Sequence, residues 1–187
     1  MIAGKTRNSR GRLFVLTGPV HSGKTTFLKK AAADWNSRGI AVGGFVCEAR
    51  REPSGIQGYD LKDLGDGTSI PFLRRDGDAG GPAAGPYRLV RGGLEKAGEI
   101  LVRDARRDIL IVDEFGPLEL AGGGIRASFE SVLAGGARCL TVVRLSLIGR
   151  FREIMRGRNP EIFRLDDPEA TADLVRAVAS LKETGGR

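Results

Sequence analysis

The sequence predicts an α/β fold with a mostly parallel central sheet flanked by helices. Two short, wholly apolar runs, residues 13–16 and 109–112, are typical of strands that are buried on both faces. Between such runs lie longer stretches in which apolar residues recur every three or four positions, as in amphipathic helices. Strands that alternate with helices favour a parallel sheet with helices on both sides.

The first strand, 13–16, leads into a glycine-containing loop and then a helix. The loop reads Gly18-Pro19-Val20-His21-Ser22-Gly23-Lys24-Thr25. We expect the helix to continue to about Ser37, because Phe27, Ala31 and Trp35 share one face and Gly39 is a typical C-terminal stop. This strand–loop–helix unit therefore covers residues 13–37.

A strand over 40–47 follows, and the next elements are predicted from turn residues. Segments 58–64 and 68–73 flank Gly65-Asp66-Gly67, which indicates a β-hairpin. Residues 75–86 are rich in Gly, Pro and Ala and are expected to form a mobile loop. The next helix is predicted from a single apolar stripe, made of Leu94, Ala97, Leu101 and Ala105.

The second half continues the alternation from the strand at 109–112. It contains a helix marked by Ile125, Phe129 and Val132, a strand at 140–143, an arginine-rich helix at 147–156 and a strand at 161–165. Asp167 suits the N-cap of a final helix, with Pro168 at its first position. That helix should bury Leu174, Val175, Val178 and Leu181. With no repeat and no linker, 1–187 is expected to be a single domain.

The loop after the first strand is a complete Walker A motif, Gly-x-x-x-x-Gly-Lys-Thr, between a strand and a helix. Its glycines let successive backbone N–H groups point at phosphate oxygens, and the helix N-terminus adds positive charge there. Lys24 is predicted to reach the β- and γ-phosphates and Thr25 to ligate Mg²⁺. The predicted nucleotide-binding set is Gly18, Pro19, Val20, His21, Ser22, Gly23, Lys24, Thr25 and Thr26.

The strand at 109–112 ends in Asp113-Glu114 and matches a Walker B strand, within a region spanning 109–120. Asp113 is predicted to hold Mg²⁺, and Glu114 to act as the general base that polarises water for attack on the γ-phosphate. The Asp-Glu tandem also indicates the P-loop branch that has an additional strand between the Walker A and Walker B strands.

Hydrolysis also calls for an arginine that stabilises the charge of the transition state. Candidates cluster after the strand at 140–143, and Arg144 lies nearest the carboxyl end of that strand, where ligands of such sheets bind. We therefore predict Arg144 as a catalytic residue. The other candidates, each of which could equally belong to a solvated helix face, are Arg150, Arg152, Arg156 and Arg158.

The charge and composition of the chain limit which kinds of ligand and partner are expected. The net charge of +7 and pI of about 9.9 suit an anionic ligand. Nucleic acid is the less favoured alternative, since the basic residues are dispersed and lack interleaved aromatics. No apolar run could cross a bilayer and no signal peptide is evident, so we expect a cytoplasmic protein without membrane contact. Cys47 and Cys139 form no metal or disulfide pattern and are expected to be small buried apolar residues.

Four blocks of this sequence resemble the THEP1-type nucleoside-triphosphatases. They are Thr17-Gly18-Pro19 with Gly23-Lys24-Thr25-Thr26; Gly44-Phe45 through Glu48-Ala49-Arg50 and Gly58-Tyr59; Gly85-Pro86-Tyr87 through Leu94-Glu95; and Val112-Asp113-Glu114-Phe115-Gly116-Pro117-Leu118-Glu119-Leu120. The last block is the most specific, because Walker B strands rarely continue as Gly-Pro-Leu-Glu.

The resemblance implies a RecA-like variant of the P-loop fold, and the β-hairpin predicted above is expected to be an insertion in it. It also implies slow, Mg²⁺-dependent hydrolysis of ATP, GTP and other NTPs with broad base tolerance, with Glu114 as base and Glu119 supporting the site. Two departures stand out. His21 occupies a position where the family usually has glycine, and Val90-Arg91-Gly92-Gly93 replaces the family's Val-Asn before Leu-Glu.

Two other functions fit a P-loop protein of this size. A nucleotide or small-molecule kinase would transfer the phosphoryl group to an acceptor, and a nucleotide-dependent switch would bind without turnover. The chain contains no Asn/Thr-Lys-x-Asp motif for reading guanine, so strict GTP specificity is not expected. The sequence makes no prediction of oligomeric state.

Overall fold

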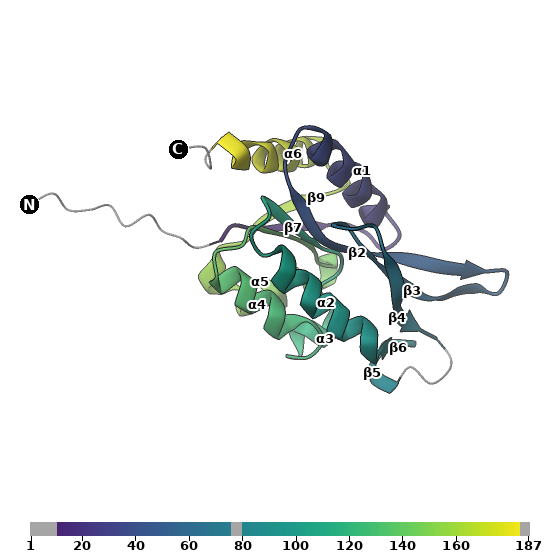
Figure 1. The fold of residues 1–187 in the computed structure, drawn as a ribbon. Helices are drawn as coiled ribbons and strands as arrows, with labels where there is room; N and C mark the ends of the chain where they lie inside the picture. Colours follow the sequence, from purple (N-terminus) through teal and green to yellow (C-terminus); the bar gives the residue numbers. More distant parts are fainter. Residues whose placement is uncertain (1–10, 76–79, 184–187) are drawn as a thin grey trace, which may run out of the picture.

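A computed structural model describes residues 11–75 and 80–183 (Figure 1), which contain one nine-stranded sheet of order β5-β6-β4-β3-β2-β7-β8-β1-β9. The strands are β1 (Leu13–Thr17), β2 (Val42–Glu52), β3 (Gly55–Asp63), β4 (Ser69–Arg74), β5 (Gly80–Ala84), β6 (Tyr87–Val90), β7 (Ile109–Val112), β8 (Cys139–Val142) and β9 (Glu161–Arg164). The helices are α1 (Lys24–Ser37), α2 (Arg91–Asp104), α3 (Pro117–Leu120), α4 (Arg126–Ala134), α5 (Ile148–Ile154) and α6 (Pro168–Glu183), with 3₁₀ turns at Leu145–Leu147 and Arg156–Arg158.

The α/β class is confirmed, and the sheet has two halves. Strands β2, β7, β8, β1 and β9 pair in parallel and form the expected core. The pairings β2–β3, β3–β4, β4–β6 and β5–β6 are antiparallel, so the sheet is mixed rather than mostly parallel. Strand β8 lies between β7 and β1, as predicted for the strand that separates the two Walker strands.

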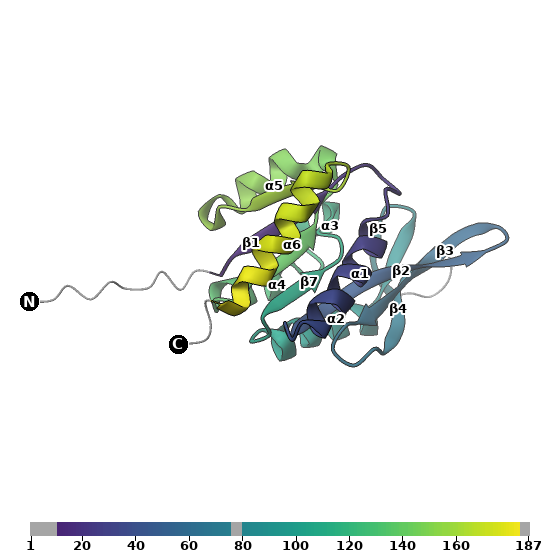
Figure 2. The same cartoon turned by 90° about the horizontal axis from the view of Figure 1, so that it is seen from above.

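Helices cover both faces of the parallel half, with α1 and α6 on one face and α2 and α4 on the other (Figures 1 and 2). Side chains of β1 alternate between the two resulting cores. Leu13 and Val15 pack with the residues of α2 and α4, whereas Phe14 and Leu16 pack with those of α1 and α6. Because neighbouring side chains of a strand point to opposite faces, a strand covered on both sides is apolar throughout. The continuous apolar runs reflect this arrangement.

The predicted helix ends are confirmed at α1 and α6. Helix α1 stops at Ser37, and Gly39 follows with a left-handed φ of 75°, the backbone conformation that glycine adopts most easily. At α6 the Asp167 carboxylate accepts the N–H groups of Glu169 (2.9 Å) and Ala170 (3.2 Å). Asp167 is therefore the N-cap of α6, and it satisfies two of the helix's free donors.

The prediction of a loop over 75–86 is wrong where the structure describes it; residues 76–79 lie outside the described residues. Gly80–Ala84 forms β5, which pairs with β6. At Gly81 the two strands are so close that a Cβ would lie 2.3 Å from the Leu89 carbonyl oxygen, so this contact requires glycine. Pro82 is tolerated because β5 is an edge strand. Strand β6 and the single-turn helix α3 were also not predicted.

The hairpin around Gly65-Asp66-Gly67 is present as the β3–β4 pair. Asp63 accepts the N–H of Gly65 and Asp66 that of Thr68, both at 2.8 Å. Strand β2 begins later than predicted and runs on to Glu52, because it pairs with β3 along the arm that projects from the sheet in Figure 1. Among residues 11–75 and 80–183, every helix is too short or too polar to cross a membrane.

Candidate active site

The Walker A loop joins β1 to α1 and contains three left-handed residues. Gly18 has a φ of 154° and Gly23 a φ of 88°, values that side chains rarely allow. A Cβ on Gly23 would meet no atom within 4 Å, so glycine is required there for its conformation and not for space. His21 also has a positive φ, 60°. This explains why glycine suits the position that His21 occupies.

Lys24 crosses the mouth of this loop. Its ammonium group donates to the carbonyl oxygens of Gly18, at 3.2 Å, and of Pro19. Partial burial lowers the pKa of Lys24, although the nearby carboxylates of Glu114 and Asp113 oppose that shift. A partly desolvated ammonium at the start of a helix is well suited to pairing with phosphate oxygens.

Asp113 is buried at the end of β7 and connects the two Walker segments. Its Oδ2 accepts the Thr25 hydroxyl at 2.7 Å and the Cys47 N–H at 3.1 Å. Burial raises the pKa of Asp113 to about 6, despite these hydrogen bonds and the positive charge of Lys24. The structure therefore brings together Thr25 and Asp113, the two residues predicted to bind metal.

These two residues fit Mg²⁺, which favours oxygen ligands and is often held by one or two carboxylates together with substrate phosphates. A hydroxyl and a carboxylate oxygen that already touch form such a partial ligand set. In the described part of the chain, no group of three or more His, Cys, Asp or Glu residues could bind a metal by itself. Phosphate oxygens of the nucleotide would have to complete the coordination.

The segment after β7 is held by the strands on either side of it. The Asp113 N–H donates to the Phe45 carbonyl on β2 at 3.2 Å, and the Phe115 N–H donates to the Val142 carbonyl on β8 at 2.7 Å. Glu114 lies between these two anchors with a φ of 76°. Such a conformation costs about 1–3 kcal/mol in a residue other than glycine and is found mainly at functional sites.

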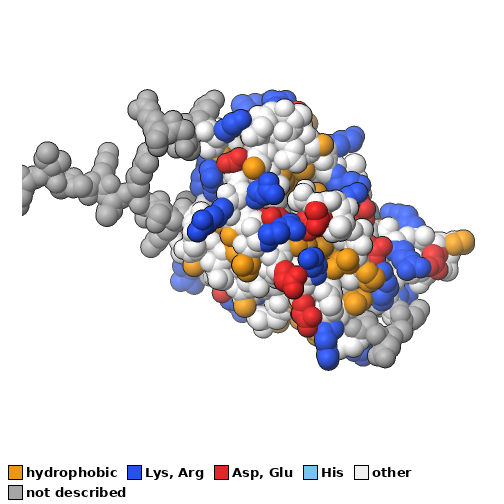
Figure 3. All heavy atoms as spheres, in the orientation of Figure 1, with side chains coloured by type: hydrophobic (Ala, Val, Ile, Leu, Met, Phe, Trp, Pro, Cys, Tyr) orange, Lys and Arg blue, Asp and Glu red, His pale blue; other side chains and the backbone are white. Residues whose placement is uncertain are grey.

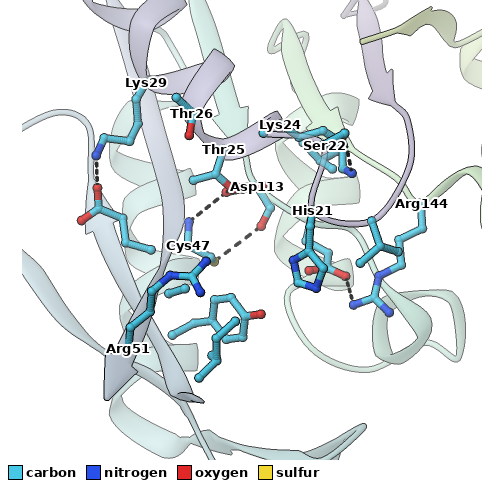
Figure 4. Close-up of a pocket in the computed structure, with 18 residues that line it drawn as sticks. His21, Ser22, Lys24, Thr25, Thr26, Lys29, Cys47, Arg51, Asp113 and Arg144 are labelled. Carbon is cyan, nitrogen blue, oxygen red and sulfur yellow. Dashed lines mark hydrogen bonds and ion pairs between the residues drawn. The ribbon is translucent and has the colours of Figure 1, made fainter. Parts of the chain in front are cut away.

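Glu114 forms an ion pair with Arg144, the residue that follows β8 and Val143 (Figure 4). The predicted base and the predicted catalytic arginine are thus in direct contact. Two other candidate arginines make contacts elsewhere: Arg150 pairs with Glu153, and Arg158 donates to the Leu133 carbonyl at 3.1 Å. Arg144 is the member of the arginine cluster that lines the cavity described next.

A cavity of about 590 Å³ opens between the loop and the ends of β2 and β7. Figure 4 shows Lys24, Thr25, Asp113 and Arg144 around it. Of the predicted nucleotide-binding set, Gly18 and Pro19 do not line the cavity; their carbonyl oxygens instead hold Lys24. The predicted site residues that line it are Val20, His21, Ser22, Gly23, Lys24, Thr25, Thr26, Asp113, Glu114 and Arg144.

Several residues of this cavity were not predicted from the sequence, and most of them lie on α1, β2 and β3. They are Lys29, Cys47, Glu48, Ala49, Arg51, Ile56, Tyr59 and Val142. Glu48 is held by an ion pair with Lys29. The sequence signal for them was the Glu48-Ala49-Arg50 and Gly58-Tyr59 block. Cys139 is fully buried as expected, whereas Cys47 is only half-buried in the cavity wall, where burial raises the pKa of its thiol.

Glu119 braces the loop that follows Glu114. Its carboxylate accepts the Gly116 N–H at 2.9 Å, and burial raises its pKa. The carboxylate also lies so close to Gly124 that a Cβ on that glycine would be 2.0 Å from Glu119 Oε1. Glu119 therefore contacts both ends of the turn that carries α3.

Comparisons with known proteins identify the family of this chain. The NTPase family model matches residues 13–173. Nucleoside-triphosphatase THEP1 of Ignicoccus hospitalis is 30% identical over 169 residues, covering 88% of this chain and 95% of the relative. The Methanopyrus kandleri relative of the same name is 40% identical over 107 residues, covering 57% and 58%.

Two solved structures share the fold. The solution structure of a human cancer-related nucleoside triphosphatase has a TM-score of 0.68 at 24% identity, covering 95% of this chain and 100% of that one. The crystal structure of THEP1 from Aquifex aeolicus has a TM-score of 0.62 at 22% identity, covering 90% and 97%. Taken with the family match, these findings show that the chain belongs to the THEP1 family of nucleoside-triphosphatases.

Proposed function

We propose that this protein is a Mg²⁺-dependent nucleoside-triphosphatase that cleaves the bond between the β- and γ-phosphates. The observation that carries the proposal is the convergence of three groups on one cavity: Lys24, the Thr25–Asp113 pair and the Glu114–Arg144 pair. Each group has a place in phosphoryl transfer, in which positioning and electrostatic stabilisation do most of the work.

Binding uses the loop and Lys24. The backbone N–H groups of the loop and the N-terminus of α1 receive the phosphates, and the Lys24 ammonium turns from the carbonyls of Gly18 and Pro19 to phosphate oxygens. Thr25 and Asp113 would hold Mg²⁺, which neutralises phosphate charge when bound.

Hydrolysis uses Glu114 and Arg144. Glu114 accepts a proton as the water oxygen bonds to the γ-phosphorus, and the bond from that phosphorus to the bridging oxygen breaks. The nucleoside diphosphate leaves with the electron pair. Arg144, already in contact with Glu114, stabilises the charge that accumulates on the phosphoryl oxygens.

The same reasoning supports broad base tolerance, because the groups with assigned roles all act on phosphate or water and none is aimed at a base. ATP, GTP and other NTPs are therefore the proposed substrates. Figure 3 shows Lys and Arg dispersed over the face in view and not gathered into a stripe, which disfavours nucleic acid as a partner. We assign residues 1–187 to one RecA-like domain, which the position of β8 between β7 and β1 supports. We also propose a cytoplasmic location, as the sequence predicts.

The test is phosphate release from ATP, GTP, CTP and UTP with Mg²⁺, for the wild type, Lys24→Ala and Glu114→Gln. Glu153→Gln is the matched control, because Glu153 also pairs with an arginine but on the exposed surface of α5. Glu114→Gln should bind nucleotide and lose about 10²–10⁴ in rate. Lys24→Ala should lose binding, and Glu153→Gln should match the wild type. Nucleotide binding by the wild type without phosphate release from any sample would refute hydrolysis and favour the switch or a kinase that requires an acceptor.

A further inference from the structure

A second cavity, of about 420 Å³, is lined by Glu114 but by no residue of the Walker A loop. Its volume is within the range of about 300–1,000 Å³ that is typical of small-molecule sites. Apolar and aromatic side chains dominate the wall, among them Phe45, Tyr59, Phe72, Tyr87, Leu89 and Leu118. The hydrolytic mechanism assigns no role to this space.

The two cavities share part of their walls. Tyr59, Glu114 and Arg144 line both, as do Cys47 and Asp113. The proposed general base therefore borders the nucleotide cavity on one side and the apolar cavity on the other. A hydroxyl group on a molecule in the second cavity would therefore be able to contact the proposed general base.

The aromatic side chains of the second cavity favour a flat ring. Phe45 and Phe72 pack at 6.2 Å between ring centroids with an interplanar angle of 53°, and Tyr59 meets Tyr87 edge-on at 5.4 Å and 84°. Phe45 and Phe72 are buried against each other, so the partly exposed Tyr59 and Tyr87 are the rings that a flat ligand can reach. Aromatic rings pack well against tilted and edge-on partners.

The charged residues that line the second cavity determine which aromatic ligands it can bind. Among the described residues that line the second cavity, Arg144 is the only cation, and it is paired with Glu114. Asp113 and Glu119 add two carboxyl groups. The proposed mechanism commits Arg144 to the γ-phosphoryl group of the nucleotide. A phosphate or carboxylate on a second ligand would therefore find no further cation among these lining residues and would face Asp113 and Glu119. An uncharged aromatic ligand with a single hydroxyl group is compatible with this wall.

We propose that the second cavity is an acceptor site for an uncharged aromatic alcohol, so that the protein also has phosphotransferase activity. This inference rests on the proposed function, because it uses the same nucleotide site and the same base. The alcohol oxygen bonds to the γ-phosphorus, its proton passes to Glu114, and the bond to the bridging oxygen breaks. The products are a phosphate monoester and a nucleoside diphosphate, and the alcohol takes the place of water.

The edge strand β5 keeps the cavity open. Ala83, Ala84 and Gly85 line it, followed by Pro86, and these small residues leave the space unfilled. Leu118 lines the cavity from α3. Ala84→Trp and Leu118→Trp would therefore fill the cavity from two different elements, and neither residue lines the nucleotide cavity. Val102→Trp is the matched control, because Val102 is 67% exposed on α2 and lines neither cavity.

The experiment incubates the full chain with ATP and Mg²⁺ and adds phenethyl alcohol or naphthaleneethanol. The methyl ethers of both compounds serve as ligands that lack a hydroxyl. Phosphorus NMR separates phosphate ester from free phosphate, and calorimetry measures binding of each compound. We expect a saturable yield of ester from the alcohols, binding without ester from the ethers, and unchanged hydrolysis in both tryptophan variants without alcohol.

In Ala84→Trp and Leu118→Trp, ester formation at a fixed alcohol concentration should fall by about 10–200-fold, the range for steric misfit in an apolar pocket. Val102→Trp should match the wild type. Hydrolysis with neither binding nor ester would overturn this inference and leave the proposed function intact. Equal ester formation in both cavity-filling variants would also overturn it. Ester formation without hydrolysis would instead overturn the proposed hydrolase and uphold the acceptor site.

Discussion

Asp104 provides a sharp test of how the parallel half of the sheet supports the active site. This residue ends α2, and its side chain is 1% exposed. It accepts hydrogen bonds from Arg103 at 2.6 and 2.8 Å and from the Gly44 N–H at 3.0 Å. Phe45, which follows Gly44 on β2, supplies the carbonyl oxygen that accepts the Asp113 N–H. Asp104→Asn keeps the shape of the side chain and removes its charge.

The expected cost follows from these contacts. A hydrogen bond to a charged group contributes about 1.5–3 kcal/mol. The Arg103 side chain is 40% exposed and keeps its bonds to Asp63, so we expect a loss near the low end, about 2 kcal/mol in the free energy of unfolding. For a chain of this length that corresponds to a fall in Tm of about 4–8 °C.

The control is Asp34→Asn, which removes the same charge from an exposed pair with Arg38 on α1. Exposed pairs contribute about 0–1 kcal/mol, so this variant should stay within about 1 kcal/mol of the wild type. Urea unfolding followed by circular dichroism measures both variants. If Asp104→Asn cost no more than Asp34→Asn, the buried network would not stabilise β2 and the reasoning would be wrong.

The same variant has a pH signature. Burial by itself would raise the pKa of Asp104, but the hydrogen bonds from Arg103 and Gly44 outweigh burial and lower it. A carboxyl with a lowered folded pKa adds stability above its unfolded pKa of about 3.9 and loses it as the pH falls towards the folded pKa. The stability difference between wild type and Asp104→Asn should therefore be constant from about pH 8 to 5 and shrink below about pH 4.

Three further predictions concern the nucleotide site. Arg144→Ala should lower kcat by about 10²–10³-fold with little change in nucleotide affinity, because one hydrogen-bond donor to the transition state is lost. An unchanged kcat would show that Arg144 does not stabilise the transition state. Chelation of Mg²⁺ should abolish hydrolysis, and Thr25→Ala should raise the Mg²⁺ concentration needed for half-maximal rate; chelator-resistant turnover would contradict the proposed ligands. His21→Gly should keep or raise Tm, whereas His21→Val should lower it by about 2–8 °C, because β-branched residues tolerate a positive φ least; equal Tm values would show that this φ carries no strain.

The nucleotide-binding loop and the ends of the strands around it can be located from the order of residues alone. Residues 18–25 are contiguous, so a strand, a glycine-bearing loop and a helix define their geometry locally. Asp113 and Glu114 could be placed for a similar reason, because they follow an apolar run that only a buried strand explains. Where function depends on neighbours in the chain, sequence pattern is sufficient to locate it.

Contacts between residues far apart in the chain become visible only in the folded molecule. Five arginines lie between positions 144 and 158, after β8. The parallel pairing of β8 with β7 brings the first of them, Arg144, against Glu114. Gly80–Ala84 has poor strand propensity and is a strand because β6 supplies its hydrogen-bond partners. The second cavity likewise exists only where β2, β3, β5 and α3 converge. These features depend on packing between segments far apart in the chain, which local periodicity and turn signals do not encode.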